Sequence, residues 1–145
     1  MTISVRNTPF DPWTELRQYQ DKMLTQYGKY GATASFVGTL RDTNLGTDVQ
    51  GMTLEHYPGM TEKSLQHIAD EARQHWAILD ILIIHRYGEL APNEPIMLAA
   101  VWAEHRAAAF DACRFIVEEL KHRAPFWKCE DLATHKRWVE QNTLK

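Results

Sequence analysis

A surplus of basic residues is missing from this 145-residue chain, and its absence excludes broad binding to polyanions. Lys and Arg number 16 against 19 Asp and Glu, which gives a net charge of −3. Proteins that bind nucleic acids or anionic membranes over a wide area need a basic face. The sequence also has no apolar run of bilayer length and no charged-then-apolar signal at its N-terminus. We therefore expect a cytoplasmic protein with no nucleic-acid or membrane partner, in which any anion site is local.

Cysteine is scarce as well, and its two positions exclude a disulfide framework. Cys113 and Cys129 do not form a C-x-x-C pair. Cys113 falls on the apolar stripe of a predicted helix, where it would serve as a small buried hydrophobe. Cys129 follows Lys128, whose charge can lower the pKa of the thiol. A nucleophilic role for Cys129 is nevertheless disfavoured, because the spacing reveals no partner base.

Motifs for bound metals and nucleotides are also missing. The seven histidines include no H-E-x-x-H or other ligand spacing, so we expect no zinc site. Neither a Walker-type loop nor G-x-G-x-x-G is present, which disfavours a nucleotide bound in those ways. We predict a protein without a metal or other cofactor.

The composition that remains is that of an ordinary globular protein. Hydrophobic residues make up 44% and charged residues 24%, and the length suits one domain over residues 1–145, with room for two lobes. Hydrophobic periodicity gives the order α-β-β-α-β-β-α, which favours an α+β domain with a largely antiparallel sheet and three main helices. The predicted helices begin near residues 12, 61 and 107, and the predicted strands span 32–40, 51–57, 78–87 and 96–103.

Capping residues and polar stretches set the predicted ends of these elements. Asp11 can cap the first helix, which keeps helical spacing as far as Tyr27. Thr61 can cap the second helix. The polar stretch 41–50 is predicted to be a loop. After residue 123 we expect a strand or extended segment followed by a short helix.

Residues 120–128, Leu-Lys-His-Arg-Ala-Pro-Phe-Trp-Lys, form the most informative stretch. Pro125 cannot continue a helix and biases the residue before it away from helical angles. A helix that ends here presents Lys121 in its last turn, and the returning chain carries Lys128. Crowding and desolvation disfavour the charged forms of two such amines, which suits anion binding or proton transfer in acyl chemistry. The alternative is that both are cations placed favourably at a helix C-terminus.

A second group of polar residues, Glu104-His105-Arg106, lies where the fourth strand meets the third helix. A helix N-terminus attracts anions, and an imidazole and a guanidinium beside it can form a cradle for phosphate or carboxylate. The alternative is a solvated helix start in which Glu104 pairs with Arg106.

Four other residues carry weaker signals. Arg41 directly follows the first predicted strand, at the base of the polar loop. Glu130 can orient Lys128 or share its proton, although a surface ion pair is the commoner arrangement. His85 and Arg86 end a buried strand, and we interpret them as structural.

Cations are numerous for an acidic protein, and their gathering in one pocket would suit a small phosphorylated or carboxylated molecule. The residues concerned are Arg41, His105, Arg106, Lys121, Arg123 and Lys128. The residues alone predict an anion-binding α+β domain, either a group-transfer enzyme with a lysine acid or base or a non-catalytic anion- or partner-binding module. RNA binding is disfavoured by the net charge.

Several motifs resemble the large, catalytic subunit of molybdopterin synthase. They are Leu-Glu-His-Tyr-Pro-Gly-Met-Thr-Glu-Lys at 54–63, Ile-His-Arg-Tyr-Gly-Glu-Leu at 84–90, His-Arg at 105–106, and the stretch 120–128. The resemblance runs from about Gly31 to Val139, whereas the first thirty residues match poorly.

The resemblance implies an α/β-hammerhead-type fold and a sulfurtransferase reaction. That family installs a dithiolene on a cyclic pyranopterin monophosphate, precursor Z, and so forms molybdopterin in molybdenum cofactor biosynthesis. Its sulfur comes from a small ubiquitin-like partner, whose C-terminal Gly-Gly tail ends in a thiocarboxylate and enters the lysine pocket. The resemblance also implies a homodimer of large subunits within a heterotetramer.

Carried over to this chain, the resemblance assigns roles to individual residues. Lys121 and Lys128 are the expected catalytic residues, which steer the thiocarboxylate and support proton transfer as sulfur adds. Arg41, His105 and Arg106 are expected to hold the cyclic phosphate and the pterin. The full set of expected substrate contacts is Thr39, Leu40, Arg41, His105, Arg106, Lys121, Lys128, Cys129 and Glu130. The expected lining of the pocket or tail channel is Phe36, Arg123 and Phe126.

Overall fold

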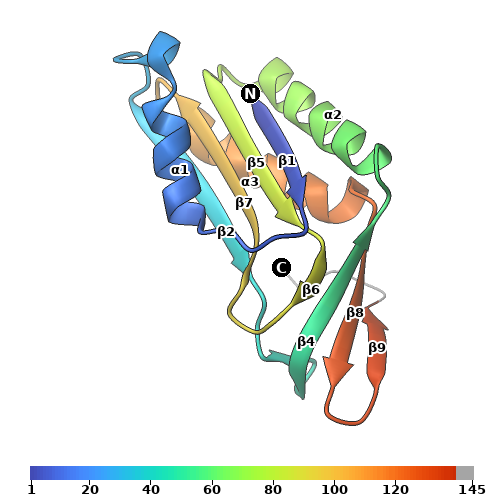
Figure 1. Ribbon diagram of the computed structural model, residues 1–145. Coiled ribbons are helices and arrows are strands. Elements are labelled where there is room, and N and C mark those ends of the chain that lie inside the picture. Colours follow the sequence, from blue (N-terminus) through green and yellow to red (C-terminus); the bar gives the residue numbers. More distant parts are fainter. Residues whose placement is uncertain (140–145) are drawn as a thin grey trace.

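The computed structural model describes residues 1–139 and contains α-helices and β-strands in comparable amounts (Figure 1). The elements in chain order are β1 (Thr2–Arg6), α1 (Pro12–Asp21), the 3-10 helix η1 (Leu24–Gln26), β2 (Ala32–Thr39), β3 (Thr43–Asn44), β4 (Thr47–His56), α2 (Met60–His75), β5 (Asp80–Arg86), β6 (Gly88–Leu90), β7 (Pro95–Ala103), α3 (Arg106–Arg123), β8 (Phe126–Leu132) and β9 (Lys136–Val139). The predicted α+β class with three main helices is confirmed.

A four-stranded sheet in the order β1-β5-β7-β2 forms the centre of the fold. β1 runs parallel to β5, and the other neighbours are antiparallel. Ile81 and Ile83 of β5 pack into the core beneath α2 and α3, whereas Leu82 and Ile84 face the core beneath α1. Figure 1 shows α1 on one side of the sheet and α2 and α3 on the other. Burial on both faces explains why the β5 sequence is almost continuously apolar.

A second, antiparallel sheet lies across one end of the first (Figure 1). Its order is β3-β4-β8-β9, and β6 pairs with the free side of β4. A small separate core, built on Leu40, Met52 and Leu54, fills the space behind it. The junction of the two sheets is therefore where segments distant in the sequence meet.

The loop predicted over 41–50 is instead a β-hairpin. Its two turn residues, Leu45 and Gly46, have positive φ values of 54° and 75°. Positive φ at both central residues is typical of the type I′ turn, whose twist matches that of the flanking strands. Leucine is an unusual residue in such a turn, so the sequence pattern did not reveal it.

Three other local predictions need correction. The first helix ends at Asp21 rather than near Tyr27, and the latter side chain is 85% exposed. The edge strand β1 was not predicted. Within 124–139 the chain forms the hairpin β8–β9 and no helix. Pairing with β4 on one side and β9 on the other stabilises the strand conformation of β8.

The N-cap of α2 is Gly59, two residues before the predicted cap Thr61, and the helix begins at Met60. Gly59 has φ 85°, which suits glycine, and its N–H donates to the Glu62 carboxylate at 2.6 Å. Thr61 is buried instead, and its hydroxyl donates to the Tyr57 carbonyl at 2.9 Å. Thr61 therefore ties the start of α2 to the end of β4.

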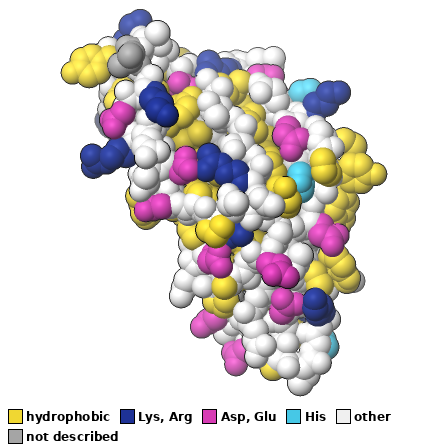
Figure 2. All heavy atoms as spheres, in the orientation of Figure 1, with side chains coloured by type: hydrophobic (Ala, Val, Ile, Leu, Met, Phe, Trp, Pro, Cys, Tyr) yellow, Lys and Arg dark blue, Asp and Glu magenta, His cyan; other side chains and the backbone are white. Residues whose placement is uncertain are grey.

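Charged side chains of both signs are interspersed on the face drawn in Figure 2. This distribution agrees with the small net charge of the chain. Among residues 1–139, no helix is long and apolar enough to cross a membrane. An anion site on such a surface requires a local concentration of positive charge.

Candidate functional site

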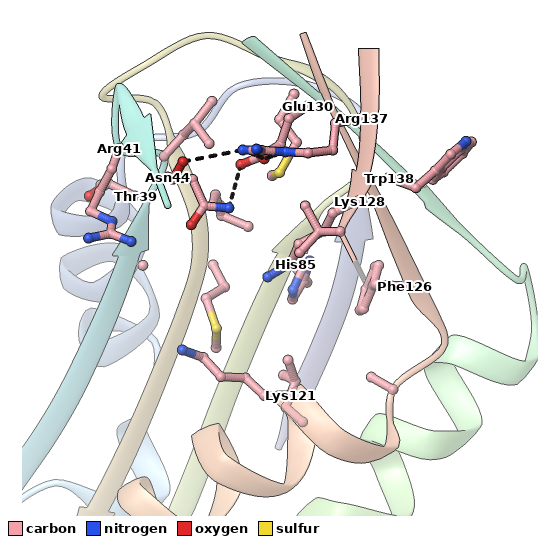
Figure 3. A pocket seen from close by; sticks show the side chains of 18 of the residues that line it. Thr39, Arg41, Asn44, His85, Lys121, Phe126, Lys128, Glu130, Arg137 and Trp138 are labelled. Carbon is pink, nitrogen blue, oxygen red and sulfur yellow. Dashed lines mark hydrogen bonds and ion pairs between the residues drawn. The ribbon is translucent and has the colours of Figure 1, made fainter. Parts of the chain in front are cut away.

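A cavity of about 1060 Å³ lies where the two sheets meet, beside the C-terminal end of α3 (Figure 3). Its size is at the upper end of the roughly 300–1,000 Å³ range of ligand pockets. The described residues that line it carry four Lys or Arg side chains and a single carboxylate. They include Phe36, Thr39, Leu40, Arg41, Asn44, His85, Lys121, Phe126, Lys128, Glu130 and Arg137. The cavity thus concentrates positive charge that the surface as a whole lacks.

The break between α3 and β8 brings two amines to this cavity. Ala124 follows the last helical residue and has extended angles, φ −77° and ψ 133°, because Pro125 comes next. Lys121 reaches the cavity from the last turn of α3, and Lys128 reaches it from β8. The structure therefore places both expected catalytic lysines in one site (Figure 3).

Lys121 lies near an aromatic ring that belongs to the neighbouring strand β2. Its Nζ is 5.9 Å from the centroid of the Phe36 ring, within the range of a cation–π interaction. Phe36 belongs to β2, which ends at Thr39 and leads directly into Arg41. Strand β2 and the last turn of α3 thus bring side chains to the same part of the cavity.

The environment of Lys128 favours its neutral form. Burial lowers the pKa of Lys128 from its ordinary value, the charge of Lys121 lowers it further, and Glu130 raises it. Because the folded-state pKa lies below the unfolded value, the buried ammonium opposes folding at neutral pH. That penalty fades as the pH rises towards 10.5. A lysine whose pKa is lowered in this way exchanges its proton more readily than an ordinary lysine.

Glu130 is buried, and both of its carboxylate oxygens are engaged. Arg137 donates to Oε1 through Nε and Nη2 at 3.1 and 2.7 Å, and the Asn44 amide donates to Oε2 at 2.9 Å. Arg137 also donates to the Asn44 carbonyl at 3.2 Å. This network joins β3, β8 and β9 along one wall (Figure 3). The sequence left open whether Glu130 orients Lys128 or forms a surface ion pair. In the structure Glu130 is buried and accepts hydrogen bonds from Arg137 and Asn44.

His85 also lines the cavity, although the sequence was interpreted as giving it a structural role. Its ring stacks on Phe126 with centroids 3.8 Å apart, and its Nδ1 lies 2.8 Å from the Arg86 carbonyl. Burial lowers the pKa of His85 to about 4. Arg86 fits the structural interpretation, since it is buried and its guanidinium lies 2.5 Å from Glu94.

His105 and Arg106 do not reach the cavity of their own chain. His105 is the N-cap of α3 with a side chain 88% exposed, and Arg106 is the first helical residue. With a rise of 1.5 Å per residue, Arg106 lies roughly 22 Å along the helix from Lys121. Within a single chain, the predicted cations therefore do not all meet in one pocket, because His105 and Arg106 lie away from it.

Arg123 points away from the cavity as well. It forms ion pairs with Glu71 of α2 at 2.8 Å and with Glu119 at 3.5 Å. Two residues along a helix turn a side chain about 200° from Lys121, which places Arg123 on the α2 side. It joins two helices rather than lining the pocket.

Cys129 is buried on the opposite face of β8 from its two neighbours that line the cavity. Successive strand residues alternate between faces, so Lys128 and Glu130 can share a wall only if Cys129 points behind it. Its thiol is therefore not among the lining groups. Cys113 is buried too, as predicted, and burial raises the pKa of its thiol to about 11.

Asn44, Arg137 and His85 line the site but were not found from the sequence. Asn44 lies in the hairpin that was predicted as a loop, and Arg137 lies in a strand that was not predicted. Burial alternates along β9, but its sequence, Lys-Arg-Trp-Val, does not alternate between polar and apolar residues, so it gave no signal for Arg137. His85 had no such signal either, because it continues a buried apolar strand.

Comparison with known proteins decides the family. The family model described as MoaE protein matches residues 5–123. The chain belongs to the MoaE family. A molybdopterin synthase catalytic subunit from Pseudomonas aeruginosa is 51% identical over 140 residues, which cover 97% of this chain and 91% of the relative. The molybdopterin biosynthesis MoaE protein of Burkholderia ambifaria superposes with a TM-score of 0.80 at 42% identity, covering 99% and 92% of the two chains.

A more distant structure shares the fold. It is the protein–protein complex of subunits 1 and 2 of molybdopterin-converting factor from Helicobacter pylori, with a TM-score of 0.80. At 18% identity over 97% of this chain and 92% of that one, the likeness shows the fold alone. The family match begins at residue 5, so the first thirty residues match better than we expected.

We predict that Arg137→Ala lowers the free energy of unfolding by about 2 kcal/mol or more, because the buried Glu130 charge loses its strongest partner. Urea denaturation at neutral pH measures the change. Lys136→Ala is the matched control on the same strand, since its side chain is 74% exposed and its amine lies 3.6 Å from Asp131. Equal losses in the two variants would contradict a special role for the Glu130 network.

Proposed function

We propose that this chain is a sulfurtransferase subunit that moves sulfur from a protein thiocarboxylate to cyclic pyranopterin monophosphate, forming the dithiolene of molybdopterin. The observation that carries the proposal is the presence of Lys121 and Lys128 in one cavity, on either side of the Pro125 break. Family membership supports it, since the curated relatives are molybdopterin synthase catalytic subunits. The cytoplasmic location expected from the sequence belongs to the same proposal.

The charges of the cavity suit the two reactants. The precursor carries a cyclic phosphate and the sulfur carrier ends in a thiocarboxylate, so both bring negative charge. Arg41, Lys121, Lys128 and Arg137 line the cavity against one carboxylate, that of Glu130. The carboxylate is already neutralised by Arg137 at 2.7 Å. The positive charges of Arg41, Lys121 and Lys128 can attract the guests and stabilise negative charge that develops as sulfur adds.

The two amines can divide the proton chemistry between them. Burial and the charge of Lys121 both lower the pKa of Lys128, so Lys128 gives up its proton more readily than an ordinary lysine. An ammonium can protonate a leaving group, and a neutral amine can accept a proton. One pair thus supplies the acid and the base that successive sulfur additions require.

The proposed sulfur carrier is a small ubiquitin-like subunit with a C-terminal Gly-Gly tail. Glycine lacks a side chain, so such a tail can bring its terminal group close to the amines. The related Helicobacter pylori structure is a complex of subunits 1 and 2 of molybdopterin-converting factor. We extend that assembly to this chain as a small subunit bound to each large subunit of a homodimer.

The homodimer gives His105 and Arg106 a role that one chain cannot. Both are exposed and lie roughly 22 Å along α3 from the lysine of the same chain. In a symmetric dimer they are free to enter the cavity of the neighbouring large subunit. We propose that they bind the phosphate or pterin there.

We predict that Lys121→Ala nearly abolishes sulfur transfer, a loss of at least about a hundredfold, because it removes a positioned acid or base. The assay combines protein, precursor and thiocarboxylated carrier, and mass spectrometry follows the gain of sulfur by the precursor. Lys128→Ala should also cause a large loss. Lys63→Ala, an exposed lysine on α2, is the control and should keep wild-type turnover.

Two outcomes of this assay would count against the proposal. Normal turnover by Lys121→Ala would remove its catalytic role. No gain of sulfur with the wild-type protein, in a complex shown to be folded, would favour a non-catalytic anion- or partner-binding module.

Mixed dimers test the role of His105 and Arg106 across the dimer. Lys121→Ala and Arg106→Ala homodimers should each be impaired, since each lacks one group in both cavities. After exchange of subunits, half of the dimers are mixed and one cavity of each is intact, so about a quarter of wild-type turnover should return. No recovery after verified exchange would place Arg106 outside the neighbouring cavity.

A further inference from the structure

His85 is fixed in the wall of the cavity by two independent contacts. The ring stacks on Phe126 with an interplanar angle of 15° and centroids 3.8 Å apart. Its Nδ1 is 2.8 Å from the Arg86 carbonyl, which can only accept a hydrogen bond. The ring plane and its rotation are therefore both determined before any ligand binds.

These contacts also determine which ring nitrogen is free. Because Nδ1 must carry the proton that it donates to Arg86, Nε2 of the neutral ring keeps a lone pair. Within residues 1–139, Nε2 makes no hydrogen bond. Among the described residues, the polar side-chain atoms that are both fully buried and without a partner are Arg86 Nε and Asp131 Oδ1. His85 Nε2 has no partner but is not in this group, so it is not fully buried. An unbonded Nε2 that is not sealed from solvent must face the cavity that the ring lines.

The surroundings of His85 keep it neutral. Burial disfavours the imidazolium most strongly, and the charges of Lys128 on β8 and His56 on β4 add to the effect. Its strand neighbours, Met97 on β7 and Val5 on β1, bring no charge. Figure 3 shows His85, Phe126 and Lys128 on one wall of the cavity. A neutral acceptor thus lies among cations that can only donate.

We propose that His85 Nε2 is a fixed hydrogen-bond acceptor for the precursor, binding an N–H or O–H group of the pterin and positioning it beside Lys128. The inference rests on the proposed function and adds a residue to its binding site. Lysine and arginine recognise the anionic part of the guest, but they offer no lone pair to its donors. Thr39, Thr43 and Asn44 also line the cavity and carry acceptor oxygens, but the neutral imidazole of His85 supplies an acceptor on the wall shared with Phe126 and Lys128.

Matched substitutions separate the two ring nitrogens. His85→Asn retains an amide near the position of Nδ1 but loses the acceptor, whereas His85→Gln places an amide oxygen near the position of Nε2. His85→Phe keeps an aromatic ring to stack on Phe126 and removes both nitrogens. Titration calorimetry with the precursor, without the sulfur carrier, measures affinity, and circular dichroism checks that each variant is folded.

We expect roughly tenfold weaker precursor binding for His85→Asn and His85→Phe, and binding within about threefold of wild type for His85→Gln. Nitrogen-15 NMR of the free protein at pH 7 should show a neutral ring protonated on Nδ1. Wild-type affinity in both His85→Asn and His85→Phe would overturn the proposal. Equal weakening in all three variants would also overturn it, because it would indicate packing alone, and so would a proton on Nε2.

Failure of this inference can be told apart from failure of the proposed function. A wild-type protein that binds the precursor but transfers no sulfur would defeat the function and leave the His85 result standing. Active wild-type protein with insensitive His85 variants would defeat the inference alone. No binding of the precursor by the wild-type protein would overturn both.

Discussion

The break in the chain at Pro125 is the constraint on which the site depends. A helix that continued past Arg123 would carry the following residues away from the sheet junction, whereas the extended Ala124 turns the chain into β8. The turn brings Lys128 back to the same cavity as Lys121. Two amines in one partly buried place repel each other, so the surrounding fold must hold them together.

The second sheet provides that support through a buried network of polar side chains around Glu130. Glu130 is buried and receives hydrogen bonds from Arg137 on β9 and Asn44 on β3, so a carboxylate fixes three strands around the cavity. The same carboxylate raises the pKa of Lys128, against the effects of burial and of Lys121. The wall that builds the pocket therefore also tunes its chemistry, and a stable scaffold carries a site that is unfavourable by itself.

Local sequence signals predicted the α+β class, a buried strand over 78–87 that the structure shows as β5 (Asp80–Arg86), and the helix that presents Lys121, because burial and proline act over short distances. The sequence could not reveal the Arg137–Glu130 network, since its members become neighbours only through the pairing of β8 with β9. It also led to the wrong expectation that His105 would join the lysines of its own chain. The length of α3 separates His105 from Lys121. That separation is known only once the structure shows that both lie at opposite ends of the same helix.

The juxtaposition of the two amines is tested most directly by the pKa of Lys128, measured by NMR of its side chain. In the wild-type protein that pKa should lie below 10.5, and Lys121→Met should raise it, because one of the two causes that lower it is removed. Lys63→Met, on the exposed face of α2, should leave it unchanged. An unaltered pKa of Lys128 in the Lys121→Met protein would contradict a shared site for the two lysines.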